Sequence, residues 1–103
     1  MARVLLVEDE PNIASFIVFK LEREGHEVRW EASALAVAAA ADATRPELVL
    51  LDSSLPDGDP FILLSELAER CPVVMMTEFR DTATPQLARL VAQLVPATDA
   101  GRP

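Results

Sequence analysis

Several residue types are scarce in this chain. It has no tyrosine and a single cysteine, Cys71, so no internal disulfide can form. Only nine basic residues stand against 17 acidic ones, which gives a net charge of −8. A chain this acidic repels the phosphate backbone of DNA and RNA, so we expect no direct binding of nucleic acid. The same charge disfavours contact with anionic membrane surfaces.

Long apolar runs are also lacking. None approaches the roughly 20 residues that span a bilayer, and no signal peptide is evident at residues 1–5. Together with the lone cysteine, these features predict a cytoplasmic protein that does not enter a membrane. The 103 residues predict a single domain. Its interior must be filled by aliphatic side chains, because only 5% of the residues are aromatic.

What the chain does have is a regular alternation of short apolar runs and helical patterns. Strands are expected at residues 3–7, 27–30, 48–51 and 73–76, and helices from Pro11 to a closing Gly25 and at 33–43, 61–68 and 85–95. Apolar strands between amphipathic helices are typical of an α/β fold with a parallel sheet and helices on both faces. Residues 96–103 hold no apolar run and are expected to form an irregular tail.

Acidic residues follow the predicted strands. Glu8 and Asp9 come directly after the first strand, Asp52 ends the third, and the hydroxyl residue Thr77 follows the fourth. Ligands of parallel sheets bind at the carboxyl ends of the strands. If these strands are neighbours, the side chains converge there, and carboxylates that meet repel one another and raise one another's pKa. A Mg²⁺ ion, which prefers oxygen ligands, relieves that repulsion.

A carboxylate beside Mg²⁺ can attack a phosphoryl group, because the metal neutralises charge that develops on the oxygens. The simpler alternative is that acidic residues after strands are solvated loops or favourable charges at helix N-termini. For Glu8 or Glu10 alone we favour that alternative. For Asp9, Asp52 and Thr77, at three separate strand ends, we favour a functional site.

These segments resemble a known family. Residues 3–11, 24–28, 46–56 and 73–77 are similar to the matching segments of bacterial response-regulator receiver domains, over roughly the first three quarters of the chain. The resemblance implies a flavodoxin-like parallel sheet with strand order 2-1-3-4-5. It implies a two-component signalling module rather than a free-standing enzyme.

The resemblance also assigns roles to individual residues. Asp52 accepts a phosphoryl group from a histidine kinase, and Asp9 binds Mg²⁺ with support from Glu8, directly or through water. The backbone carbonyl of Ser54 is the remaining protein ligand of the metal. Thr77 is the switch hydroxyl that moves toward the phosphoryl group and shifts a two-state face of the domain.

The sequence departs from the family pattern in its last third. Family members carry a lysine after a fifth strand, whereas the single lysine here is Lys20, in the first predicted helix. No fifth strand or fifth helix is predicted, Glu78 stands where a small residue is usual, and Pro60 where glycine is common. Without those elements apolar surface of the first helix, at Phe19 and Val18, would be bared, so we expect self-association, for which exchange of an element between protomers is one route.

Two alternatives to a working receiver remain. One is a pseudo-receiver, an interaction module that keeps the fold without the phosphate cycle. The other is a hydrolase of the dehalogenase type, which needs a second carboxylate two residues after the first, where this chain has Ser54.

Four further residues are given structural expectations. His26 is expected to be a solvated turn residue and Trp30 to be partly buried on an outer strand. Asp59 is expected to cap a helix, and Asp57 to be a loop residue that could crowd the metal site.

Overall fold

A four-stranded parallel sheet forms the centre of the computed structural model, which describes residues 2–76. Its elements are β1 (Arg3–Val7), α1 (Pro11–Arg23), β2 (Glu27–Glu31), the short 3-10 helix η1 (Ala34–Ala36), α2 (Val37–Thr44), β3 (Leu48–Asp52), α3 (Pro60–Ala68) and β4 (Val73–Met76). All four predicted strands and the first three predicted helices are confirmed. The helix predicted at 85–95 and the tail at 96–103 lie outside the described residues.

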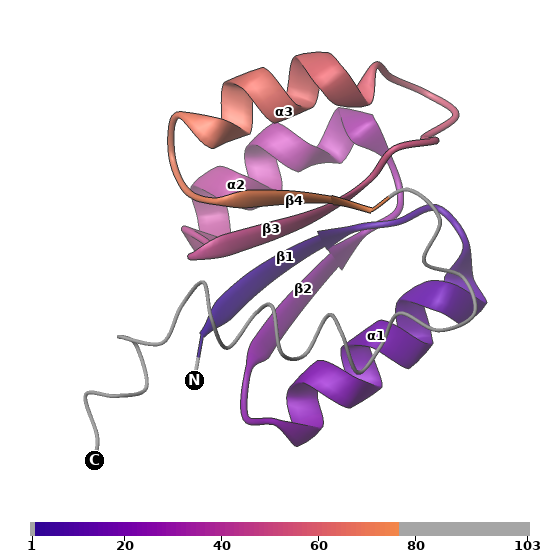
Figure 1. The fold of residues 1–103 in the computed structure, drawn as a ribbon, viewed down its shortest axis with the longest axis vertical. Coiled ribbons are helices and arrows are strands. Elements are labelled where there is room, and N and C mark those ends of the chain that lie inside the picture. The colour runs from indigo at the N-terminus through magenta and orange to yellow at the C-terminus, as the bar shows by residue number, and fades with distance from the viewer. Residues whose placement is uncertain (1, 77–103) are drawn as a thin grey trace.

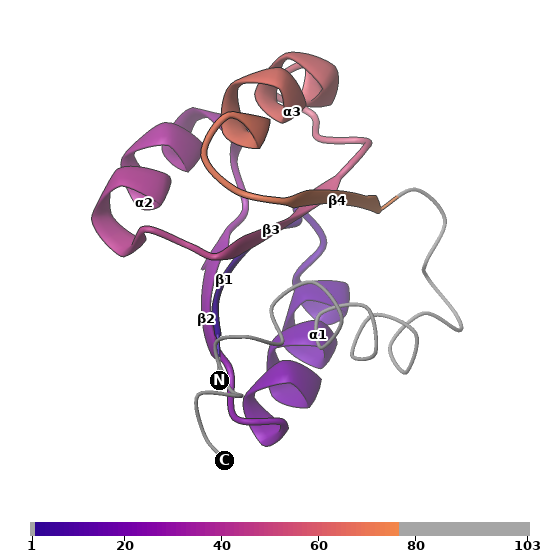
Figure 2. The same ribbon diagram turned by 60° about the vertical axis from the view of Figure 1, so that its left-hand side comes forward.

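The sheet has the strand order β2-β1-β3-β4, so β1 and β3 are its inner strands. Helix α1 covers one face, and α2 and α3 cover the other (Figure 1). The view in Figure 2 separates the three layers. This arrangement confirms the α/β, flavodoxin-like class. It also brings the carboxyl ends of β1 and β3 side by side, in the register Val7 opposite Leu51.

The inner strands are buried on both faces, which explains their unbroken apolar runs. Leu6 and Leu50 pack toward α1, against Ala14, Ile17 and Leu21. Their neighbours Leu5 and Leu51 pack on the opposite side, with residues of α2 and α3 such as Val37, Ala40, Ala41 and Leu67. All four leucines are 0% exposed. The residues that directly follow β1 and β3 are therefore anchored by a tightly packed core.

The helices begin and end at recognisable signals. The Glu10 carboxylate accepts from the backbone N–H groups of Asn12 and Ile13 at the start of α1, and Gly25, with a φ of 94°, follows its end. At the start of α3 the Asp59 carboxylate accepts from Phe61 N at 2.9 Å, as expected of a capping residue. Pro60 is the first residue of α3, a position that requires no N–H.

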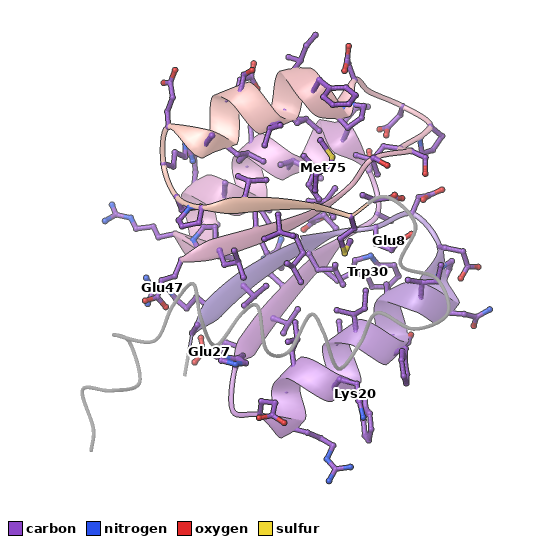
Figure 3. The ribbon with its side chains drawn as sticks, viewed as in Figure 1. Glu8, Lys20, Glu27, Trp30, Glu47 and Met75 are labelled. Carbon is purple, nitrogen blue, oxygen red and sulfur yellow. The ribbon has the colours of Figure 1, made fainter. Side chains whose placement is uncertain are left out.

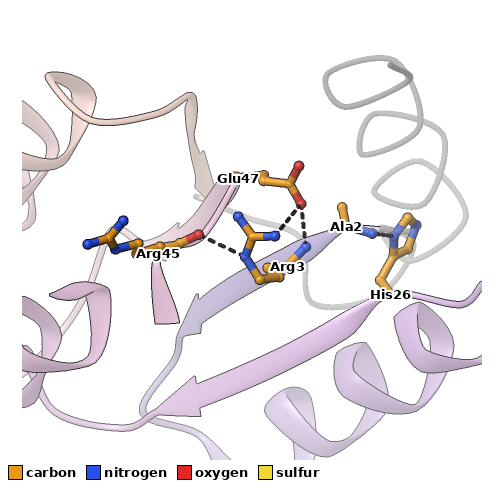
Figure 4. Close-up of polar contacts among 5 residues, drawn as sticks. All are labelled: Ala2, Arg3, His26, Arg45 and Glu47. Atoms are coloured by element: carbon orange, nitrogen blue, oxygen red, sulfur yellow. Dashed lines mark hydrogen bonds and ion pairs between the residues drawn. The ribbon is translucent and has the colours of Figure 1, made fainter. Parts of the chain in front are cut away.

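One expectation about the amino-terminal edge of the sheet is wrong. His26 is not a solvated turn residue: it is only 8% exposed, and its Nδ1 accepts a hydrogen bond from Ala2 N at 3.0 Å. The pairing of the parallel strands β1 and β2 begins there, since Glu27 N donates to Ala2 O at 2.8 Å. On the other side of β1, the Glu47 carboxylate accepts from Arg3 N at 2.9 Å (Figure 4). Both neighbouring strands thus hold the start of β1.

None of the helices within residues 2–76 combines the length and the apolar character needed to cross a membrane.

Candidate functional site

Three carboxylates meet at the carboxyl edge of the sheet. One carboxylate oxygen from each of Glu8, Asp9 and Asp52 lies within 4.8 Å of the other two. Glu8 and Asp9 follow β1, and Asp52 is the last residue of the neighbouring strand β3. The structure therefore brings together three of the residues that the sequence singled out. Thr77, the predicted switch hydroxyl, lies outside the described residues.

Asp52 is nearly inaccessible to solvent, at 3% exposure. Its Oδ1 accepts two hydrogen bonds from Ser54, one from the backbone N and one from Oγ, both at 3.2 Å. Its Oδ2 is buried and finds no hydrogen-bond donor among the described residues. An unpaired carboxylate oxygen in the interior lowers the stability of the fold, because it has lost its hydrogen bonds to water and no protein donor replaces them.

Glu8 is the second buried carboxylate, at 4% exposure. Burial is the main cause that raises its pKa to about 7, and the negative charges of Asp52 and Asp9 raise it further. The hydrogen bond from Glu10 N to Glu8 Oε2, at 3.1 Å, acts in the opposite direction. Near neutral pH the site thus holds a proton that a cation can displace.

The backbone of Glu8 is held in place by β2. Its N–H donates to Glu31 O at 3.1 Å, and its carbonyl accepts from Trp30 Nε1 at 2.7 Å. Figure 3 shows Glu8 and Trp30 next to each other at this edge. Trp30 lies on the outer strand β2, as expected, and at 37% exposure it is one of the exposed large apolar side chains of residues 2–76. Its contact with the site was not predicted, because the sequence gives no signal for how the segment after β1 is oriented.

The segment that follows Asp52 also differs from expectation in one respect. Asp57 does not crowd the three carboxylates. Its Oδ1 accepts instead from Ala34 N at 2.9 Å, and its Oδ2 accepts from the Ser33 hydroxyl. Ser54, whose carbonyl is the predicted metal ligand, contacts Asp52 through its amide and side chain.

The donor set suits a small, hard divalent cation. Carboxylate oxygens are the ligands that Mg²⁺ takes in proteins, usually one or two of them together with water. Surface carboxylates often cluster without binding metal, but here two of the three are buried and one oxygen lacks any donor among residues 2–76. The residues present therefore fit Mg²⁺.

Comparison with known proteins places this geometry in a family. Residues 4–92 match the response regulator receiver domain, and the chain belongs to that family. The fold agrees: the receiver domain of the Francisella response regulator 1452 superposes with a TM-score of 0.82 over 96% of this chain and 100% of that chain, at 19% identity. The BeF3-activated N-terminal receiver domain of Klebsiella pneumoniae RstA, at 25% identity, covers 87% of this chain and 79% of its own, with a TM-score of 0.69.

Curated relatives are named as transcriptional regulators. The KDP operon transcriptional regulatory protein KdpE of Escherichia coli is 39% identical over 80 residues, which are 75% of this chain and 35% of that protein. The regulator TcrA of Mycobacterium tuberculosis is 35% identical over 91 residues, or 85% and 36% of the two chains. The DNA-binding dual master transcriptional regulator RpaA of Synechocystis is 33% identical over 82 residues, or 75% and 34%. This chain thus spans about a third of the length of these relatives.

Proposed function

We propose that this receiver domain is a working phosphoacceptor, in which Asp52 takes a phosphoryl group from a histidine kinase in the presence of Mg²⁺. The observation that carries the proposal is the Asp52 carboxylate, which clusters with those of Glu8 and Asp9 and has a buried oxygen, Oδ2, without a donor in the described chain. In the reaction, a carboxylate oxygen of Asp52 attacks phosphorus while the bond from phosphorus to the kinase imidazole nitrogen breaks. The imidazole leaves with the electron pair of that bond.

Each residue of the site has a proposed task. Asp9 and Asp52 hold Mg²⁺, Glu8 supports it directly or through water, and the Ser54 carbonyl supplies the remaining protein ligand. When bound, the ion supplies positive charge to the phosphoryl oxygens. The hydrogen bonds from Ser54 to Oδ1 of Asp52 orient the carboxylate and leave Oδ2 to react. We assign the switch hydroxyl to Thr77.

Phosphorylation of the isolated chain tests the proposal. Acetyl phosphate with Mg²⁺ should add one phosphoryl group, detected as a mass increase that is labile to base. Asp52→Asn should abolish the increase, and Asp42→Asn, on the exposed surface of α2, should leave it unchanged. If the parent chain neither gains mass nor binds beryllofluoride, the phosphoacceptor role fails, and an interaction module without a phosphate cycle becomes the better explanation.

The surroundings of the domain are part of the proposal. We propose one domain over residues 1–103, with 96–103 as a tail, acting in the cytoplasm on a histidine kinase and making no direct contact with nucleic acid. Support for the last point comes from the net charge of −8. DNA binding by the relative RpaA would then rest on the part of that protein that this chain does not match.

We also propose that the chain associates with copies of itself. Phe16 and Phe19 on α1 are 53% and 56% exposed, and such apolar surface favours contact between copies. Exchange of an element between protomers is one route to such contact. Light scattering at about 50 µM, in the range where sticky species associate, should show dimers. Only monomers at that concentration would contradict it.

A further inference from the structure

A loop contact outside the carboxylate cluster bears on the metal site. The segment from Ser53 to Asp59 joins β3 to α3 and carries Ser54, two residues after the acceptor Asp52. Its far end is tied to a different part of the chain, the residues that lead from β2 into α2. Asp57 Oδ1 accepts from Ala34 N at 2.9 Å, and Oδ2 accepts from the Ser33 hydroxyl and from Leu35 N, the latter at 3.3 Å.

The contact is more than a chance surface hydrogen bond. Three donors converge on one carboxylate, and these hydrogen bonds, with the Ser33 hydroxyl first and Ala34 N second, lower the pKa of Asp57. Charge-assisted bonds of this kind are about twice as strong as neutral ones. The Ser33 hydroxyl also accepts from Leu35 N at 3.1 Å, so Ser33 and Asp57 together cap the start of η1.

The adjacent backbone confirms how closely the two segments pack. A Cβ built on Gly58 would lie 2.5 Å from the Cβ of Ala34, a distance that real atoms do not tolerate. Gly58 is therefore needed for close approach, and the loop has little freedom to move toward η1 or to slide along it. Since only two residues separate Ser54 from Asp57, a displacement at Asp57 reaches the Ser54 backbone.

From these contacts we infer that Asp57 is a positioning residue for the metal site. It holds the β3–α3 loop against the start of α2 and so fixes where the Ser54 backbone lies relative to Asp52. The inference rests on the proposed function, because it takes the Ser54 carbonyl as a ligand of Mg²⁺. Groups that orient metal ligands without touching the metal affect binding through the geometry of those ligands.

Two measurements on the full chain test the inference. Calorimetric titration with Mg²⁺ should show that Asp57→Ala binds about tenfold more weakly, the lower end of the effect of removing an orienting group. Exchange of the backbone amide hydrogens of residues 53–55, measured without metal, should become faster. Ser33→Ala, which changes no charge, should act in the same direction with a smaller effect, and Asp57→Asn should recover part of the loss.

Matched controls separate positioning from charge and from stability. Asp42→Ala also removes one exposed carboxylate but only loses a surface ion pair with Arg70, so its Mg²⁺ affinity should equal that of the parent. Gly58→Ala should weaken Mg²⁺ binding by pushing the loop off Ala34, and the double variant Gly58→Ala with Ala34→Gly should restore it. A role in stability alone would not produce this recovery of affinity.

The outcomes distinguish the two claims. Equal Mg²⁺ affinity in Asp57→Ala and Asp42→Ala, or unchanged amide exchange at residues 53–55, overturns the positioning role and leaves the phosphoacceptor proposal standing. Absence of Mg²⁺ binding in the parent overturns the phosphoacceptor proposal and the metal part of this inference. The exchange rates then decide on their own whether Asp57 holds the loop.

Discussion

The indole Nε1–H of Trp30 donates a hydrogen bond to the backbone carbonyl of Glu8 over 2.7 Å. It joins an edge strand of the described sheet to the loop that carries two of the three clustered carboxylates. Because Trp30 is the only tryptophan of the chain, the candidate site has its own fluorophore. Changes in the position or charge of Glu8 should therefore be visible in tryptophan emission.

Titration with Mg²⁺ should change the emission of Trp30 with the same midpoint that calorimetry gives. Trp30→Phe keeps most of the ring packing but loses the donor to Glu8, which should destabilise the domain by about 1 kcal/mol, the usual net value of one hydrogen bond. It should also weaken Mg²⁺ binding. If calorimetry detects Mg²⁺ binding and the emission of Trp30 does not change, the proposed link between Trp30 and the metal site is contradicted.

The affinity for Mg²⁺ should depend on pH through Glu8. Its pKa is raised to about 7, mainly by burial, so below that pH a proton must leave before the carboxylate can support a cation. Affinity should rise as the pH increases toward 7 and level off above it, and binding should release protons to the buffer. Glu8→Gln should bind more weakly and flatten this dependence. A parent chain whose affinity does not change between about pH 5.5 and 7.5, the span around that pKa, would exclude the role of Glu8.

Replacing the acceptor should stabilise the metal-free domain. Asp52→Asn removes one of two neighbouring buried charges and supplies a donor for Glu8, so we expect a gain of about 1 kcal/mol, with the melting temperature rising by roughly 4–8 °C for a domain of this size. Thermal unfolding at pH 8, with a chelator to remove metal, measures this rise in melting temperature. Asp42→Asn, with the same chemical change on an exposed side chain, should shift the melting temperature little. A lower melting temperature for Asp52→Asn would show that repulsion between the carboxylates of Asp52 and Glu8 does not destabilise the domain.

The sequence predicted this arrangement where local pattern decides the structure. Runs such as Leu48–Leu51 are short and wholly apolar, which predicts strands buried on both faces. The strand order that brings Asp52 beside Glu8 and Asp9 came from the resemblance to receiver domains. The sequence did not predict the contacts of His26, Trp30 and Asp57. Each of these contacts joins residues more than 20 positions apart in the sequence. Periodicity and turn propensity are local patterns and do not predict contacts at that separation. The burial of His26 shows the limit most clearly, because histidine beside glycine has the composition of an exposed turn.

His26 should make the stability of the domain depend on pH. Burial is the main cause that lowers its pKa from the usual 6.5, the positive charge of the amino terminus lowers it further, and Glu24 and Glu47 act in the opposite direction. Nδ1 must be unprotonated to accept from Ala2 N. When the pH falls through 6.5, the unfolded chain takes up a proton that the folded chain resists, so this contribution is present above 6.5 and is lost as the solution becomes acidic.

Glu8 titrates in the same range with the opposite sign. Its raised pKa means that the folded chain holds a proton more tightly than the unfolded one, so its contribution to stability falls as the pH rises from 4.5 to about 7. The effect of His26 is therefore best measured in a Glu8→Gln background. There, urea unfolding at pH 5 should give a stability roughly 1 kcal/mol below that at pH 7, the value of one lost hydrogen bond. Adding His26→Gln, whose side-chain carbonyl can still accept from Ala2, should flatten the difference; if it persists unchanged, another group is responsible.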